Sequence, residues 1–294
     1  MKATTRQLSD RGRFFIVAGL FILCGTAAVF GSAVPARANA FTMAENQLLG
    51  RLGVSYFLTS NYFDNHGDVE KNVDKLHYRD VSGHLWLRWA VLDSLELGLH
   101  PRFRYQYWTY ETPEPDSEFQ EVTSTEMGDL DLDAQWRIFG NQWVAIAVDG
   151  LVKLPYFYDE DAELPPGDGQ LDAEGRLLAA TRFSLFNAGL DFGYRYRDED
   201  PADLWVYGGE FGFAYSIVYG KLRVEGASSA GNAADDAELR DFLHGPDYAL
   251  GTTAITFGIK PSNHWRLDLT ASHTIWGRNA AQGTTLMLAT GVEY

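Results

Sequence analysis

Along most of the chain, apolar and polar side chains alternate with a period of two residues. Between positions 143 and 156, Val144 and Ile146 fall on one face and Asp149 and Lys153 on the other. This alternation is typical of β-strands that have one apolar face and one polar face. Together with the turn signals, it predicts twelve strands, at 48–60, 75–90, 95–110, 126–138, 143–156, 171–183, 188–197, 204–215, 220–227, 248–260, 265–277 and 284–294.

The predicted connections alternate in length. Tight turns are expected at 91–94, 139–142, 184–187, 216–219 and 261–264, and mostly longer loops at 61–74, 111–125, 157–170, 198–203, 228–247 and 278–283. An even strand number, with short turns on one rim and long loops on the other, is the bacterial outer-membrane arrangement. We therefore expect an all-β fold, a transmembrane antiparallel up-and-down β-barrel of about 12 strands, with N- and C-termini in the periplasm. A soluble sandwich, which would also alternate, is the rival fold.

The last predicted strand, 284–294, ends on an aromatic residue. Leu288, Val292 and Tyr294 share one of its faces. This pattern resembles the closing strand of outer-membrane barrels, which the barrel-assembly machinery reads. We expect these three residues to form the barrel-closing C-terminal signal.

The N-terminus has the composition of an export signal. A basic region precedes an apolar run from Phe14 to about Phe30, and Ala38-Asn39-Ala40 is a small-x-small cleavage pattern. We expect residues 1–40 to be a cleaved signal peptide and 41–294 to be a single barrel domain. The rival readings are a membrane-anchoring helix and a lipoprotein signal on Cys24. No other cysteine exists, so the mature chain can form neither a disulfide nor a thiolate metal site.

Negative charge is concentrated in the long connections. The first 40 residues hold five of the 24 Lys+Arg and one of the 40 Asp+Glu, which leaves 19 and 39 in the mature chain, a net charge of −20. The long connections hold 23 acids against three basic residues. Acidic loops commonly just keep a surface solvated. The sharper hypothesis is that they bind divalent cations shared with lipopolysaccharide, or repel anionic solutes at the mouth.

The central part of the chain, from about Met127 to Phe183, carries a family resemblance. Its motifs are Gly128-Asp129-Leu130-Asp131-Leu132 with Gln135-Trp136-Arg137, then Lys153-Leu154-Pro155, then Gly167-Asp168-Gly169-Gln170-Leu171-Asp172. They resemble the outer-membrane transporter family named after the MetA pathway of phenol degradation. This sequence departs from the family in its long acidic loop at 157–170 and in Gln135, where the family has a basic residue. The resemblance implies a barrel that lets small, often aromatic or apolar, compounds across.

The period-two alternation along each strand assigns near-equal numbers of acidic and basic side chains to the barrel interior. The expected pore-lining residues are Arg102, Arg104, Trp108, Asp129, Asp131, Asp133, Arg137, Lys153, Asp172, Glu174, Arg176, Arg195 and Arg197. The same alternation places Trp86 and Trp276 on the inner face. Counting from the ends of loop 157–170 brings Lys153 opposite Glu174. Such an interior is either a wet channel or a salt-bridged plug.

The function expected from this pattern is passive uptake of small organic, possibly aromatic or apolar, solutes. The alternatives are a closed structural or receptor-type barrel and an outer-membrane lipid hydrolase. A hydrolase of this kind needs a lipid-facing histidine with a serine beside it, and His273 has only threonines nearby, so we expect no enzyme. The histidines show no metal-binding spacing, and we expect no metal, no cofactor and no nucleic acid. The expected partners are outer-membrane lipid and lipopolysaccharide, the assembly machinery and a small-molecule solute.

Overall fold

The computed structural model describes residues 40–71, 77–111, 119–155, 170–198, 202–230, 249–262 and 264–294. These residues form the strands β1 (Leu48–Phe63), β2 (Val69–Lys71), β3 (His77–Leu92), β4 (Leu95–Glu111), β5 (Phe119–Gly140), β6 (Val144–Leu154), β7 (Asp172–Phe183), β8 (Phe186–Arg197), β9 (Leu204–Tyr215), β10 (Val218–Ser229), β11 (Ala249–Ser262), β12 (Trp265–Arg278) and β13 (Ala280–Glu293). Within this part of the chain, no helix is long and apolar enough to cross a membrane.

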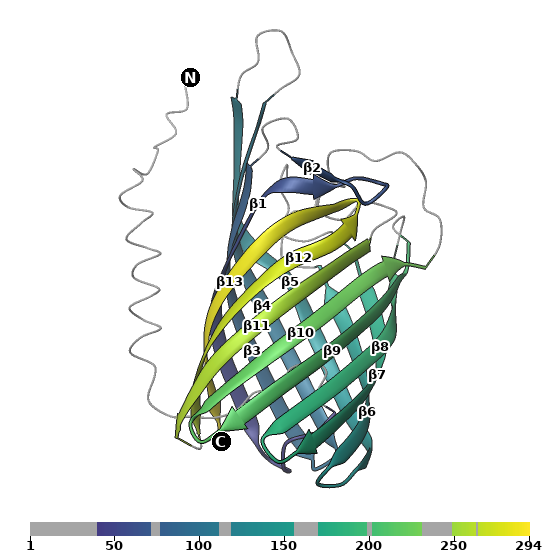
Figure 1. Ribbon diagram of the computed structural model, residues 1–294, viewed down its shortest axis with the longest axis vertical. Coiled ribbons are helices and arrows are strands. Elements are labelled where there is room, and N and C mark those ends of the chain that lie inside the picture. The colour runs from purple at the N-terminus through teal and green to yellow at the C-terminus, as the bar shows by residue number, and fades with distance from the viewer. Residues whose placement is uncertain are drawn as a thin grey trace, which may run out of the picture. The chain divides into compact units, whose positions relative to one another are not determined.

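Twelve of these strands form a closed barrel. Each long strand pairs antiparallel with the next long strand, and β13 pairs back with β1 (Figure 1). Closure satisfies the backbone hydrogen bonds of both edge strands, which a membrane requires. The predicted antiparallel up-and-down barrel of twelve strands is therefore confirmed. The short strand β2, which the alternation did not predict, pairs with the loop end of β1.

The barrel is apolar outside and polar inside. On β6, Val144 and Ile146 are exposed, whereas Ala145, Ala147 and Asp149 are buried. A soluble sandwich would bury its apolar face and expose its charges. The observed inversion suits a lipid environment, because an exposed band of large apolar side chains is stable there and not in water.

A β-bulge overturns one parity assignment. The β11–β12 register runs Gly251↔Trp276 and then Thr252↔Thr274, so one extra residue of β12 lies between the two pairs. The extra residue turns Trp276 to the outer face, where its ring lies parallel to that of Tyr207 with centroids 6.5 Å apart. The expectation that Trp276 faces inward is therefore wrong.

Leu48 and Tyr294, at the two ends of the barrel sequence, lie at the rim that carries the tight turns. The backbone groups of Leu48 and Tyr294 exchange two hydrogen bonds of 2.8 Å there. At the same rim, Ser184 and Ser216 adopt positive φ angles of 53° and 55° in the turns after β7 and β9. Most of the acidic connections expected on the opposite rim lie outside the described residues.

Candidate functional site in the barrel interior

Residues 41–47, which precede β1, lie inside the turn end of the barrel; we call them the N-terminal strap. Ala40 is fully buried in an apolar cluster with inward side chains of β6 and β7, including Ala147 and Leu178. Phe41 packs against this cluster, and the guanidinium carbon of Arg182 lies 4.5 Å from the centroid of its ring. The first residues of the strap are thus held on the β6–β7 wall.

The rest of the strap is held by hydrogen bonds to β3, β4 and the turn between them. The Met43 N–H donates to the Glu96 carboxylate, and the Glu45 N–H donates to Asp93 Oδ1 at 2.9 Å. The Thr42 hydroxyl donates to the Asp93 carbonyl, and the Asn46 N–H donates to the Ala90 carbonyl at 2.7 Å. The strap therefore connects the β6–β7 sector of the inner wall with the β3–β4 sector, and β5 lies between the two. Sequence reasoning missed it, because period-two alternation carries no signal for a non-strand segment.

A ladder of ion pairs covers the interior of β6 to β10. Lys153 Nζ lies 3.0 Å from Asp172, Arg195 Nη2 lies 2.6 Å from Glu174, and Arg176 Nη1 lies 2.7 Å from Asp191. Asp191 also pairs with Arg223 of β10, and Arg176 pairs with Glu174. Nearly every carboxylate here serves two or more cations, so this wall is a continuous network.

A second network covers β3 to β5. Arg104 pairs with Asp80 at 2.7 Å, and Arg102 pairs with Asp131 at 3.3 Å. Closer to the strap, Arg88 pairs with Glu96 at 3.0 Å and with Asp133. Glu96 thus links this network to the strap through its bond from Met43.

The structure places the expected lining residues on the inner face, with two refinements. Arg137 lies at the turn rim and donates from Nη2 to the Asp93 carbonyl at 2.8 Å. In the β6–β7 register, Lys153 lies opposite Asp172, and Glu174 lies opposite Leu151. The predicted pairing of Lys153 with Glu174 is therefore wrong by two residues. Trp108 and Asp129 are buried, and the other charged members of the set belong to the two networks.

Four side chains on neighbouring strands form a hydrogen-bonded chain that sequence reasoning also missed. Ser55 Oγ lies 2.8 Å from His84 Nε2, His84 Nδ1 lies 3.3 Å from His100 Nε2, and His100 Nδ1 lies 3.3 Å from Asp131. An ionised Asp131 accepts a hydrogen bond from Nδ1–H of His100. If both rings are neutral, His100 Nε2 then accepts from His84 Nδ1–H, and His84 Nε2 accepts from the Ser55 hydroxyl. The Trp86 ring stacks on both imidazoles, with centroids 4.9 and 4.7 Å away. This cluster lines the inner wall beside the second network.

Features considered for other chemistry lie elsewhere. His273 faces outward and its Nδ1 lies 2.9 Å from the Thr284 hydroxyl oxygen. Among the described residues, no group of three or more His, Cys, Asp or Glu side chains could hold a metal ion. Leu288 of β13 and Tyr294, which follows this strand, are exposed, and Val292 pairs with Gly50 and Trp265.

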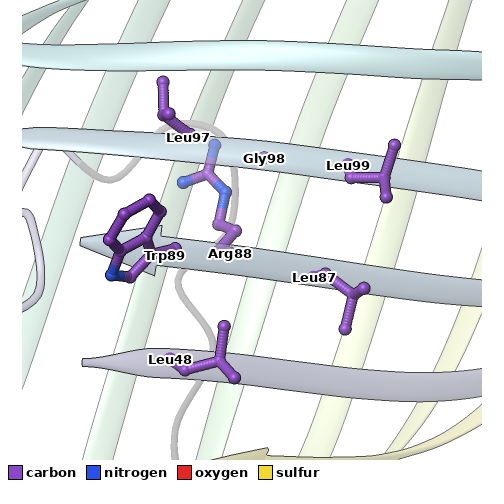
Figure 2. Close-up of a pocket in the computed structure, with 7 residues that line it drawn as sticks. All are labelled: Leu48, Leu87, Arg88, Trp89, Leu97, Gly98 and Leu99. Atoms are coloured by element: carbon purple, nitrogen blue, oxygen red, sulfur yellow. The ribbon is translucent and has the colours of Figure 1, made fainter. Parts of the chain in front are cut away.

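A shallow pocket opens on the outer wall near the turn rim. Figure 2 shows its lining, Leu48, Leu87, Arg88, Trp89, Leu97, Gly98 and Leu99. Gly98 lies between Leu97 and Leu99, and a Cβ atom there would point to the inner face, 2.2 Å from the Asp133 carboxylate. Because the leucines face outward, this pocket belongs to the lipid-facing surface and not to the interior.

Solved structures share this architecture. The chain is similar to the COG4313 outer membrane channel from Pseudomonas putida F1, with a TM-score of 0.67 and 12% identity over 90% of this chain and 100% of that chain. The fold is that of an outer-membrane β-barrel. Weaker likenesses are to the CymD monoaromatic hydrocarbon channel, with a TM-score of 0.46 and 10% identity over 86% of this chain and 89% of that one, and to the NanC porin, with a TM-score of 0.48 and 7% identity over 82% and 98%. Comparison with protein-family models and with curated sequences finds no match.

Proposed function

We propose that the protein is a passive outer-membrane channel for small organic solutes, with the N-terminal strap as a movable closure at its turn end. The observation that carries the proposal is the strap itself. It lies inside an outer-membrane-type barrel and is held by a few hydrogen bonds and by the contact of Phe41 with one small apolar cluster. A segment held this weakly can leave, and its departure would open the turn end of the lumen.

The placement in the cell follows from the same arrangement. Residues 1–40 would direct export, the tight-turn rim and both termini would lie in the periplasm, and the acidic loops would face lipopolysaccharide. The exposed side chains of Leu288 and Tyr294, together with Val292, would present the C-terminal signal to the assembly machinery. The apolar outer face and the polar inner face support this placement.

The solute class is proposed from the lining. The inner wall carries many charges of both signs in mutual contact, which gives no strong preference for one ion sign along most of its length. Trp86, which stacks on His84 and His100, and the buried Trp108 add inward rings on β3 and β4. Together with the resemblance to the phenol-degradation transporter family, this lining supports small, weakly polar or aromatic solutes.

The test is uptake into proteoliposomes. Phenolic, sugar and anionic solutes are compared in vesicles with the wild-type protein, with a variant lacking residues 41–46, and without protein. We expect phenolic solutes to enter faster with the wild type, and faster still with the truncated variant. Rates equal to those of protein-free vesicles for both proteins would contradict the channel function.

A closed structural or receptor-type barrel is the second candidate, because the strap and the ion-pair networks fill much of the interior. It predicts no solute entry with either protein. A barrel that conducts only without its strap would instead show that the strap is a plug awaiting a release signal.

A further inference from the structure

Two arginines meet where the two ends of the barrel sequence close on each other. Arg51 of β1 and Arg266 of β12 are both register partners of Gly291 on β13, which lies between them and has no side chain. Arg51 Nη2 and Arg266 Nε each lie 3.2 Å from the same oxygen, Oδ2 of Asp268. Two guanidinium groups therefore share one carboxylate on the inner wall.

Small residues make room for this cluster, and two aromatic rings border it. The Trp86 ring lies over Gly53, where a Cβ atom would be 3.0 Å from it, and the Arg51 guanidinium lies 4.5 Å from the centroid of this ring. On the other side, the Tyr219 ring lies over Gly258, and the Arg266 guanidinium lies 5.5 Å from its centroid. The result is a flat site with a cationic centre between two rings.

Several buried polar atoms of this cluster have no hydrogen-bond partner among the described residues. The side chain of Arg266 is only 8% exposed, yet its two terminal nitrogens contact no acceptor, and its Nε makes no hydrogen bond despite the ion pair. The Nε of Arg51 and the hydroxyl of Tyr219 are likewise buried without a hydrogen-bond partner among the described residues. Both carboxylate oxygens of Asp268 are buried without a hydrogen bond as well, so the two ion pairs leave polar groups of the cluster unsatisfied. Such groups are costly, and the terminal nitrogens of Arg266 can donate to a further acceptor in the lumen.

The part of the inner wall around Arg51 and Arg266 also carries more positive than negative charge. The cations are Arg51, Arg266, Lys260 and Lys221, and the acids are Asp268, Glu293 and Glu210. Glu210 lies 3.6 Å from Lys221 but also serves Arg223. The networks on β3 to β8 have no such excess. One negative charge would balance the sector.

We propose that the Arg51–Arg266 cluster binds small organic carboxylates in the lumen. A carboxylate matches the planar fork of a guanidinium, and its two oxygens can accept from both arginines and from the Tyr219 hydroxyl. The flanking rings of Trp86 and Tyr219 favour a carboxylate with a small apolar or aromatic body. This inference rests on the proposed function for the route by which the ligand arrives, and it names one solute class.

Equilibrium binding tests the site separately from transport. Calorimetric titration of the full-length protein in detergent, at low salt, uses benzoate as the probe and benzamide as its neutral counterpart. We expect benzoate to bind and benzamide not to bind. Arg266→Gln and Arg51→Gln should each weaken benzoate binding at least tenfold, because each removes a charged donor. Asp268→Asn should strengthen it several-fold, because it removes the competing carboxylate, a gain that a merely structural role would not produce.

Arg104→Gln is the matched control. It also removes one inward guanidinium, but from the loop-side network, where Asp80 is its partner, so benzoate binding should stay within twofold of wild type. Wild-type protein that binds no benzoate, or arginine variants that bind it unchanged, would overturn the site. Chloride that displaces benzoate at equal concentration would overturn the assignment to carboxylates. Transport can persist in each of these cases, so failure of the site does not imply failure of the channel.

Discussion

The strap offers the sharpest test of how the barrel closes. Asp93 lies in the turn between β3 and β4, and its carboxylate accepts the Glu45 N–H at 2.9 Å. Asp93→Ala removes this acceptor and leaves the Asp93 carbonyl free to bind Thr42 and Arg137. The variant therefore weakens the strap without disturbing the interior ion pairs.

The magnitude follows from the contacts that hold the strap. Five hydrogen bonds join the strap to the barrel: three to neutral acceptors at about 1 kcal/mol each and two to carboxylates at about 1.5–3 kcal/mol each, together roughly 6–9 kcal/mol. Ordering the chain costs about 1–2 kcal/mol per residue, which is of similar size over so short a segment. The net free energy of docking the strap is then close to zero. The Asp93 bond is partly exposed, so its loss should cost about 1.5 kcal/mol, a roughly tenfold rise in the released population.

The assay is thiol labelling of the strap. Met43→Cys provides a half-buried thiol, and its rate of reaction with a water-soluble maleimide measures how often the strap is released. Asp93→Ala should raise that rate about tenfold and raise channel open probability in planar bilayers in parallel. Glu70→Ala, which removes an exposed acid of β2 at the other rim, should change neither quantity. Equal labelling rates with and without Asp93 would refute the reasoning.

Three further predictions concern the wall. Ile146→Arg, on the lipid face, should destabilise the barrel by about 2–4 kcal/mol in denaturant unfolding from vesicles, whereas Ser272→Arg, on the inner face, should cost much less; equal costs would reverse the assigned faces. Asp172→Asn removes a carboxylate shared by three cations, of which Arg195 keeps Glu174, and should cost about 3–5 kcal/mol. Lys153→Met should cost less, because it leaves the Asp172 carboxylate two arginines; the reverse order in the same unfolding assay would show that the network is not shared as described. Gly251→Val places a Cβ atom 1.8 Å from the indole nitrogen of Trp276. The variant should therefore shift the tryptophan emission and lower the stability of the barrel by about 1–3 kcal/mol; an unchanged spectrum would mean that the Trp276 ring does not pack on Gly251.

The sequence alone determined the strands, their number and most of their faces. Side-chain direction in a strand is a local property, so alternation between Ile146 and Ala147 already separates outside from inside. The same local rule explains why nearly all the expected lining residues face inward. It also explains the error at Trp276, because a one-residue bulge changes parity and leaves little trace in the sequence.

The tertiary structure decided which residues meet. The partner of Lys153 depends on the register across a long loop, and counting from predicted strand ends was wrong by two residues. The strap on β6 and β7, and the meeting of Arg51 with Arg266 across Gly291, join positions that are far apart in the chain. Only barrel closure brings such positions together, because pairing between the first and last strands is a long-range contact that no local pattern encodes.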